Sequence, residues 1–469
     1  MNKLSVLPAS IFIRFLVVFI IALLAFGLIT VNVSIEFVNA ISILVLLCFV
    51  LAPLLQLTVT NFYDSFFWLL IVNSVLSVYC LALYMSSLNN FLLIIFPMFL
   101  SSSIFLIQYR KIISFRSAIS IILFFLSVPS IYSSISSDLV TIDRNLAYIF
   151  YSFFLPLIFY LGIREIKDFT QSQNIICFTF IITIIISLVL VPIELLARGL
   201  SYSSISSIEI AGRSYSLLAA LIIIAPIFFD WISKQSKFLK LVFLFLILLS
   251  ILISFSRGVF IFCLLALIPV LIINGIKRPK ILVFSFLIIL LLLLTVLFFR
   301  ENEVIAEIIR FWSVRLNIYD NITGIYSFDI SSILSSSGRL DLWKNADYWF
   351  SQNMLFGYGI GSTPELLVES TGIRFGFGGM HNQSLTILVE RGIIGFLALI
   401  VLWLMYIYKI LQLSKEKLFY MYCFFLYFAY AHSTGIELLV LSSKDFNSHT
   451  LIYFLMMLAH IENMIEKKR

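Results

Sequence analysis

Long apolar segments recur from one end of the chain to the other and constrain its fold more than any other feature. The first begins near Ile11, and windows of about 17–20 residues, enough to cross ~30 Å of hydrocarbon, continue to the C-terminus. Of the 469 residues, 62% are hydrophobic and only 12% are charged. That charged fraction is about half that of an average soluble domain. The pattern predicts an all-α polytopic membrane protein and excludes a soluble globule.

We predict about 12–14 transmembrane helices, with about fourteen as the central estimate. The windows that meet near residues 256 and 436 are also compatible with broken or re-entrant helices. The first window lacks a small-residue cleavage site, so we interpret it as a span and not as a removed signal peptide. The predicted spans cover residues 11–30, 40–59, 66–85, 91–107, 117–135, 145–162, 175–194, 215–232, 239–256, 258–274, 281–299, 393–410, 418–436 and 446–464.

Basic residues gather in three short loops, at residues 110–116, 234–240 and 277–280. Together these loops hold nine basic residues and no acidic ones. The positive-inside rule places such loops in the cytoplasm. With fourteen spans all three fall on one side, together with both termini. The count therefore predicts cytoplasmic termini and an outside location for residues 300–392.

The predicted organisation has three parts: residues 1–299 with transmembrane helices 1–11, a large loop at 300–392, and C-terminal transmembrane helices at 393–469. Loops longer than about 15 residues tend to be functional. Residues 300–315 repeat apolar side chains at helical spacing, which predicts an amphipathic helix on the bilayer surface. The stretch "GRLDLWKNADYWF" predicts a second short helix. We therefore expect the chemistry in this loop.

One of the four histidines lies in "HNQSLTILVERGIIG", residues 381–395, at the end of the loop. A helix that begins near Asn382, with the amide as its N-cap, would place His381 at the positive end of the helix dipole. Free backbone N–H groups favour an anion such as a phosphate there. Alternatively, His381 is an ordinary interfacial polar residue, and Gly392 and Gly395 allow close helix packing. Periodicity alone leaves both interpretations open.

Two arginines outside this stretch also have alternative interpretations. Arg257, in "SFSRGVF", lies between two apolar windows. An arginine within hydrocarbon costs ~2.5–3.5 kcal/mol on insertion scales, so it faces a cavity or partner, or it extends its head group to the interface. Arg198 follows Glu194 by four residues and is interpreted as its helical ion-pair partner.

The element "GYGIG" is not interpreted as a nucleotide-binding loop, because no strand precedes it and no βαβ unit surrounds it. Its glycines instead allow the backbone to approach a ligand or to turn tightly. His432 and His449 flank the last predicted outside loop, where they either line a substrate path or are satisfied interfacial residues. His460 is predicted to lie near the cytoplasmic end, far from the loop.

The stretch "HNQSLTILVERGIIG" fits the pattern His-Asn, nine residues, Gly, two residues, Gly. It resembles the signature of bacterial O-antigen ligases and the related Wzy-type O-antigen polymerases, in which it closes a large periplasmic loop. "SFSRGVF" is similar to a Ser-Arg-Gly element of the family, and "GRLDLWKNADYWFSQNMLFGYGIGS" resembles its pattern of arginine, tryptophan and Gly-x-Gly. "AGRSYSLLAAL" is similar to a Gly/Arg element but lacks the asparagine-proline that usually follows. The resemblance covers roughly residues 200–410.

The resemblance implies a glycosyltransferase of the GT-C-type membrane class that uses an undecaprenyl-pyrophosphate-linked oligosaccharide donor. It implies His381 as the base or acceptor-orienting residue, and Arg257 and Arg339 as ligands of the pyrophosphate. Glu390 is an alternative base, although Arg391 beside it suggests an ordinary interfacial pair. No cofactor and no metal are implied. The remaining substrate-binding candidates are Arg213, Asn382, Gly357, Gly359 and Gly361.

The expected partners are a lipid-linked donor and acceptor, the lipid bilayer and a chain-length regulator; no nucleic acid is expected. The expected location is the bacterial inner membrane, with a periplasmic active site. A flippase or transporter of lipid-linked sugars is the main alternative from another class. Transporters place their binding groups near the bilayer midplane on broken or repeated helices. Here polar residues are concentrated in one outer loop, and we see no internal repeat.

The charge of the large loop favours a polymerase over a ligase. Residues 300–391 contain seven basic and ten acidic residues, a net charge of −3. A ligase must bind the multiply phosphorylated lipid A–core, which favours a basic surface. A polymerase needs only a second lipid-linked repeat unit, whose sugars serine hydroxyls, Trp343 and Trp349 could hold. Polymerase is therefore the primary prediction, with ligase as the alternative.

Overall fold

The described part of the chain is helical, and none of it forms a strand. In the computed structural model the described residues are 54, 56–59, 61–85, 91–111, 117–136, 142–198, 212–253, 261–266, 339–371, 382–413, 417–433 and 449–467. Their helices are α3 (Phe62–Met85), α4 (Phe91–Tyr109), α5 (Ala118–Ser127), α6 (Pro129–Ser136), α7 (Ile142–Ile149), the π-helix η1 (Phe150–Phe154), α8 (Leu155–Glu165), α9 (Phe169–Arg198), α11 (Gly212–Lys234), α12 (Lys237–Ile253), α17 (Arg339–Gln352), α18 (Thr363–Thr371), α19 (Gln383–Leu411), α20 (Lys417–Ser433) and α21 (His449–Glu466). The all-α prediction is confirmed.

Three of the described helices are long and apolar enough to cross a membrane: Asn145–Glu165, Phe169–Ile186 and Gln383–Leu411. Shorter apolar helices lie at Phe96–Tyr109 and Ala118–Ser133. The predicted spans at 11–30 and 281–299, and the predicted amphipathic helix at 300–315, lie outside the described residues. The helices agree with a multi-pass membrane protein, as the sequence predicts.

The apolar window at 117–135 is not one straight helix, because Pro129 interrupts it. α5 ends at Ser127 and α6 begins with Pro129. Proline has no backbone N–H, and its ring would clash with the carbonyl four residues before it, so it starts a helix more easily than it continues one. The break at Val128 leaves the carbonyl end of α5 available to other groups.

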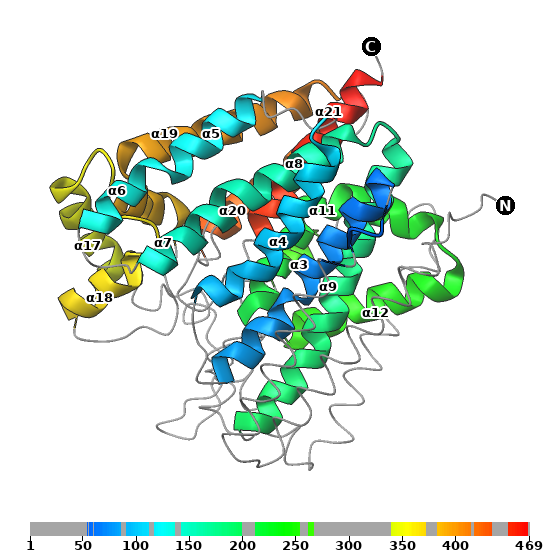
Figure 1. Cartoon of the computed structure of the whole chain (residues 1–469), viewed down its shortest axis with the longest axis horizontal. Coiled ribbons are helices and arrows are strands. Elements are labelled where there is room, and N and C mark those ends of the chain that lie inside the picture. The colour runs from blue at the N-terminus through cyan, green and yellow to red at the C-terminus, as the bar shows by residue number, and fades with distance from the viewer. Residues whose placement is uncertain are drawn as a thin grey trace.

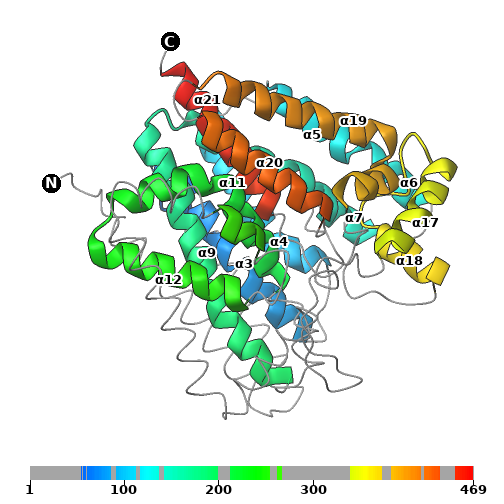
Figure 2. The ribbon, with the colours of Figure 1, turned by 180° about the vertical axis from the view of Figure 1, so that it is seen from behind.

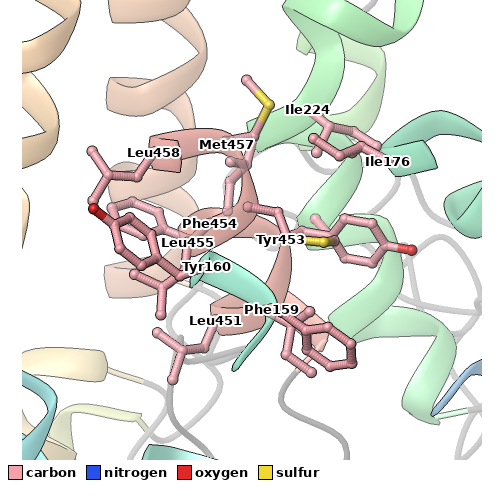
Figure 3. Packing of buried hydrophobic residues seen from close by; sticks show 14 of the residues in the cluster. Phe159, Tyr160, Ile176, Ile224, Leu451, Tyr453, Phe454, Leu455, Met457 and Leu458 are labelled. Carbon is pink, nitrogen blue, oxygen red and sulfur yellow. The ribbon is translucent and has the colours of Figure 1, made fainter. Parts of the chain in front are cut away.

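α21 is the central helix of the bundle and contacts α8, α9, α11 and α19. Residues 450–463 are all buried, as expected for a helix that is surrounded by others. Figure 3 shows Leu451, Phe454 and Leu458 of α21 packed among side chains from neighbouring helices, including Phe159 and Tyr160 of α8. α19 and α5 run side by side along one side of the bundle in both views (Figures 1 and 2).

A group of charged side chains holds the C-terminal end of α19 against α8 and α21. The carboxylate of Glu462 accepts a hydrogen bond from the Tyr160 hydroxyl at 2.6 Å and lies 3.0 Å from the Lys409 ammonium. Glu462 is buried, so the two partners satisfy a carboxylate that would otherwise be costly to bury. The other end of α19 leads to the candidate functional site.

Candidate functional site

The motif helix α19 begins where the sequence predicts. Asn382 has an extended backbone (φ −151, ψ 112), and its side-chain carbonyl accepts a hydrogen bond from the Leu385 N–H at 3.2 Å. This is the usual geometry of an asparagine N-cap, which satisfies one of the free N–H groups of the first turn. The predicted N-cap is confirmed, and it fixes the point at which the chain leaves His381 and enters the helix.

The four residues with the main assigned roles are only partly placed. His381 and Arg257 lie outside the described residues. Arg339 is the first residue of α17 and Arg213 the second of α11, and the side chains of both lie outside the described part. Their roles stay predictions. The structure does describe Asn382, which follows His381 in the sequence, and the helix that it caps.

α19 is broken at Gly392, which has φ 61 and ψ −166. This region of backbone space is essentially restricted to glycine. After the break, the Ile393 N–H donates to the carbonyl oxygen of Met354 at 2.8 Å, and the Ile394 N–H donates to that of Leu355 at 3.4 Å. The donors that would have bonded within the helix are thus satisfied by the segment that follows α17.

The same segment also satisfies the carbonyl groups before the break. The Tyr358 N–H donates to the Val389 carbonyl at 2.9 Å, and the Gly359 N–H donates to the Glu390 carbonyl at 2.9 Å. Backbone polar groups in a protein interior need such partners. Residues 354–359 therefore pair with the helix break through four backbone hydrogen bonds, and they include the first two glycines of the glycine-rich segment, residues 357–361.

The glycines of this segment are explained by close packing against protein. Gly357 has φ 69, and a Cβ atom there would lie 2.5 Å from the backbone nitrogen of Arg391. A Cβ atom on Gly361 would lie 2.5 Å from the Tyr148 ring. At Gly357 and Gly361 the group that approaches the backbone is protein, α19 and the Tyr148 ring respectively. Their predicted contact with substrate stays a prediction.

Glu390 and Arg391 are not the ordinary interfacial pair that their adjacency suggests. Glu390 is 5% exposed, and its carboxylate accepts hydrogen bonds from the Thr363 hydroxyl at 2.8 Å and the Thr363 N–H at 3.3 Å. Thr363 begins α18, where a negative charge is favoured by the helix dipole. Glu390 therefore holds the start of α18 against α19.

Arg391 is 1% exposed and reaches a different element. Its Nη1 donates to the Leu126 carbonyl at 2.6 Å and to the Ser127 hydroxyl at 3.4 Å. Both acceptors lie at the end of α5, where Pro129 interrupts the helix. The interfacial-pair interpretation is wrong because both side chains are buried, and their hydrogen bonds lead to different elements.

A small apolar core joins these elements into one unit, which we call the loop unit: α17, residues 353–362 and α18, packed on the start of α19. Figures 1 and 2 show α17 and α18 together at one end of the bundle. Trp349 is 5% exposed, so it is not available to stack on a sugar as expected. The core consists of Ala346, Trp349, Leu366, Leu367 and Val389, with Trp343, Tyr358 and Leu385 packed against it.

His432 lies beside the motif helix, which sequence spacing does not reveal. Its Nε2 is 2.7 Å from the Ser384 hydroxyl, and its Nδ1 is 2.7 Å from the Phe428 carbonyl. A carbonyl only accepts, so Nδ1 carries the proton, and neutral Nε2 accepts from Ser384. His432 is thus the satisfied polar residue of the second interpretation, and it ties α20 to the first turn of α19.

The other two histidines are placed elsewhere. His449 is the first residue of α21, and its side chain lies outside the described part. His460 is fully buried, and its Nδ1 is 2.7 Å from the Ser172 hydroxyl. It lies two residues from Glu462, at the opposite end of the bundle from the loop unit.

Comparison with known proteins identifies the same part of the chain. Residues 241–400 match the family model described as O-antigen ligase. The matched range contains Arg257, Arg339, the glycine-rich segment and the His-Asn motif, whereas Arg213 lies outside it. No curated protein matches the chain significantly. Residues 241–400 are therefore similar in sequence to O-antigen ligases, which supports the resemblance to the superfamily of O-antigen ligases and polymerases.

Proposed function

We propose that the protein polymerises undecaprenyl-pyrophosphate-linked oligosaccharide repeat units into O-antigen or a related surface polysaccharide. The pairing of the glycine-rich segment with the break in the motif helix is the main support. The two stretches are about 30 residues apart in sequence, yet four backbone hydrogen bonds join them. Two of the elements on which the family resemblance depends, the glycine-rich segment and the helix of the His-Asn motif, are thus joined to each other.

In the proposed reaction an acceptor sugar hydroxyl attacks the anomeric carbon of the donor. A new glycosidic C–O bond forms as the bond between that carbon and the pyrophosphate oxygen breaks. His381 accepts the hydroxyl proton, and a neutral imidazole with a reference pKa of ~6.5 suits this task. Asn382, the N-cap of α19, directly follows His381 in the sequence.

The departing undecaprenyl pyrophosphate develops negative charge. Arg257 and Arg339 are assigned to stabilise it, because guanidinium groups bind phosphate oxygens through two parallel hydrogen bonds. Arg213 is a weaker candidate for the same task. Arg391 is not among these candidates, because its buried guanidinium already donates to the end of α5.

The burial of Arg391 bears on the choice between polymerase and ligase. Residues 300–391 carry a net charge of −3, and Arg391 belongs to their seven basic residues. With Arg391 buried and Arg339 assigned to the pyrophosphate, five basic residues of this range remain, against nine acidic ones when the buried Glu390 is also left out. Little positive charge is thus left for a phosphorylated lipid A–core. A second lipid-linked repeat unit needs no such surface, so the charge supports a polymerase.

Ligase is the second candidate, since the matched family model is itself described as O-antigen ligase. A ligase would use the same donor and differ only in its acceptor. The donor-site residues are therefore the same in both proposals, and the acceptor must be identified by experiment.

The proposed setting is the bacterial inner membrane, with cytoplasmic termini and the loop unit in the periplasm. The three basic loops at 110–116, 234–240 and 277–280 support this orientation by the positive-inside rule. A chain-length regulator is the proposed protein partner.

The deciding experiment is the lipopolysaccharide ladder of a strain that lacks the protein. A polymerase predicts core capped with a single repeat unit, and restoration of the ladder by the wild-type gene but not by His381→Ala. Bare core, with long polymer accumulating on undecaprenyl pyrophosphate, would identify a ligase. An unchanged ladder would overturn both proposals.

A further inference from the structure

The loop unit exposes a short apolar surface that the proposed chemistry does not use. Met354, Leu355 and Phe356 are consecutive, and they are 54%, 59% and 40% exposed. They follow Ser351, Gln352 and Asn353, which are polar and also exposed. Three consecutive exposed apolar side chains in an ordered loop usually mark an interaction site.

These residues are held rigidly against the membrane helix. The carbonyls of Met354 and Leu355 accept the hydrogen bonds from Ile393 and Ile394 that bridge the helix break. The depth of Ile393 relative to the bilayer therefore sets the depth of the apolar surface.

The exposed side chains of α19 show where Ile393 lies relative to the hydrocarbon core of the bilayer. They form a continuous stripe with helical spacing that begins at Ile393: Ile393, Leu397, Val401, Leu404, Tyr408 and Leu411. From Ile393 to Leu411 the helix rises about 27 Å at 1.5 Å per residue, close to the ~30 Å of a hydrocarbon core. Ile393 therefore marks one boundary of the hydrocarbon, and Met354 lies at the same level.

α19 is also suited to contact lipid. Of the three candidate membrane spans it has the smallest share of its surface buried inside the protein. Its buried side includes Leu399, Leu402 and Tyr406, so the exposed stripe faces away from the bundle. The apolar loop surface continues this stripe at its end.

We propose that Met354, Leu355 and Phe356 insert into the membrane leaflet at the N-terminal end of α19 and anchor the loop unit to the bilayer. The occupant of the surface is the acyl-chain region of that leaflet. The continuity with the α19 stripe is the reason to choose lipid over a protein partner. Exposed Tyr348 of α17 fits the same boundary, because aromatic hydroxyls favour the headgroup level.

The anchor keeps the loop unit close to the membrane. If the proposed function is correct, it holds the site at the level of a lipid-linked pyrophosphate. The anchor itself depends only on α19 crossing the bilayer, so it can be tested without any glycan substrate.

The test uses spin labels on the full chain in vesicles of phosphatidylethanolamine and phosphatidylglycerol. Single labels are attached to Leu355→Cys, to Leu404→Cys in the middle of the stripe, and to Ser351→Cys on the polar side. Unmodified protein, labelled in parallel, gives the background from the five native cysteines. Met354→Cys repeats the measurement if Leu355→Cys fails to reconstitute.

We expect dissolved oxygen to relax the label at Leu355, as it relaxes the label at Leu404. We expect a water-soluble nickel chelate to relax the label at Ser351 but not the label at Leu355. Relaxation by the nickel chelate at both Leu355 and Met354 would overturn the anchor. Shielding from both reagents would also overturn it, because it would mean that a second copy or another protein covers the surface. Neither outcome bears on the transferase activity, which the lipopolysaccharide ladder tests separately.

Discussion

The Thr363 hydroxyl donates a 2.8 Å hydrogen bond to the carboxylate of Glu390, 27 residues further along the chain. Both residues are buried, with Thr363 fully buried and Glu390 5% exposed. The contact joins the start of α18 to the motif helix, beside the break at Gly392. Substitutions at this contact therefore test directly whether the loop unit is one structure.

Glu390→Ala should destabilise the loop unit by about 1–3 kcal/mol, because it leaves a buried hydroxyl and N–H of Thr363 without their acceptor. Glu390→Gln should cost less, since its side-chain carbonyl can still accept. The measurement is limited proteolysis of purified protein, with cleavage within residues 353–371 as the readout. Glu369→Gln, at an exposed position on α18, is the matched control. Equal protection of Glu390→Ala and the control would contradict the proposed contact.

The backbone conformation at Gly392 leads to a separate prediction. Gly392→Ala should lower stability, because the backbone conformation costs a non-glycine residue about 1–3 kcal/mol. A Cβ atom would also collide with the carbonyl of Leu355. Gly392→Asn should be no better, since φ 61 with ψ −166 is not the left-handed helical region that asparagine tolerates.

Thermal unfolding in detergent, followed by size-exclusion chromatography, would measure the effect. Leu397→Ala is the control, because this side chain is 54% exposed on the same helix. A Gly392→Ala protein as stable as the control would mean that the helix can straighten without loss.

Sequence patterns predict the helices well and their long-range pairing poorly. The N-cap at Asn382 and the short helix α17 follow from local residue types, so both could be predicted. The break at Gly392 could not, because a single glycine inside an apolar helical pattern is tolerated and gives no sign of its backbone angles. Without the break, the sequence pattern predicts Glu390 and Arg391 at an interface and not in the interior.

The docking of the glycine-rich segment on α19 could not be predicted from the sequence either. It uses backbone N–H and carbonyl groups, which every residue has, between segments with no shared periodicity. The contact between Ser384 and His432 is equally hard to predict, because their side chains meet only where α20 packs on α19. Such contacts follow from tertiary packing and not from spacing along the chain.

The proposed mechanism predicts that the transferase needs no metal ion. The charge on the departing pyrophosphate is assigned to Arg257 and Arg339, and guanidinium groups keep their charge without a cation. Purified protein treated with EDTA should therefore retain its activity on a lipid-linked donor. Loss of activity that a divalent cation restores would show that the site includes a metal.

The roles assigned to His381 and Arg257 predict that their substitution abolishes activity and leaves folding unchanged. His381→Ala and Arg257→Ala should insert and purify like wild type yet abolish glycan transfer. Arg257→Lys should also be impaired, because a lysine ammonium cannot form two parallel hydrogen bonds to a phosphate. The elution profile of each purified variant checks the fold, and transfer from a lipid-linked donor in vesicles measures the activity.

His432→Gln is the comparison variant. Its amide can still hydrogen-bond to Ser384, and we expect it to retain more activity than His381→Ala. If His381→Ala and Arg257→Ala both made full-length polysaccharide, the catalytic assignment would be wrong, whereas a fold lost in every variant would make these residues structural.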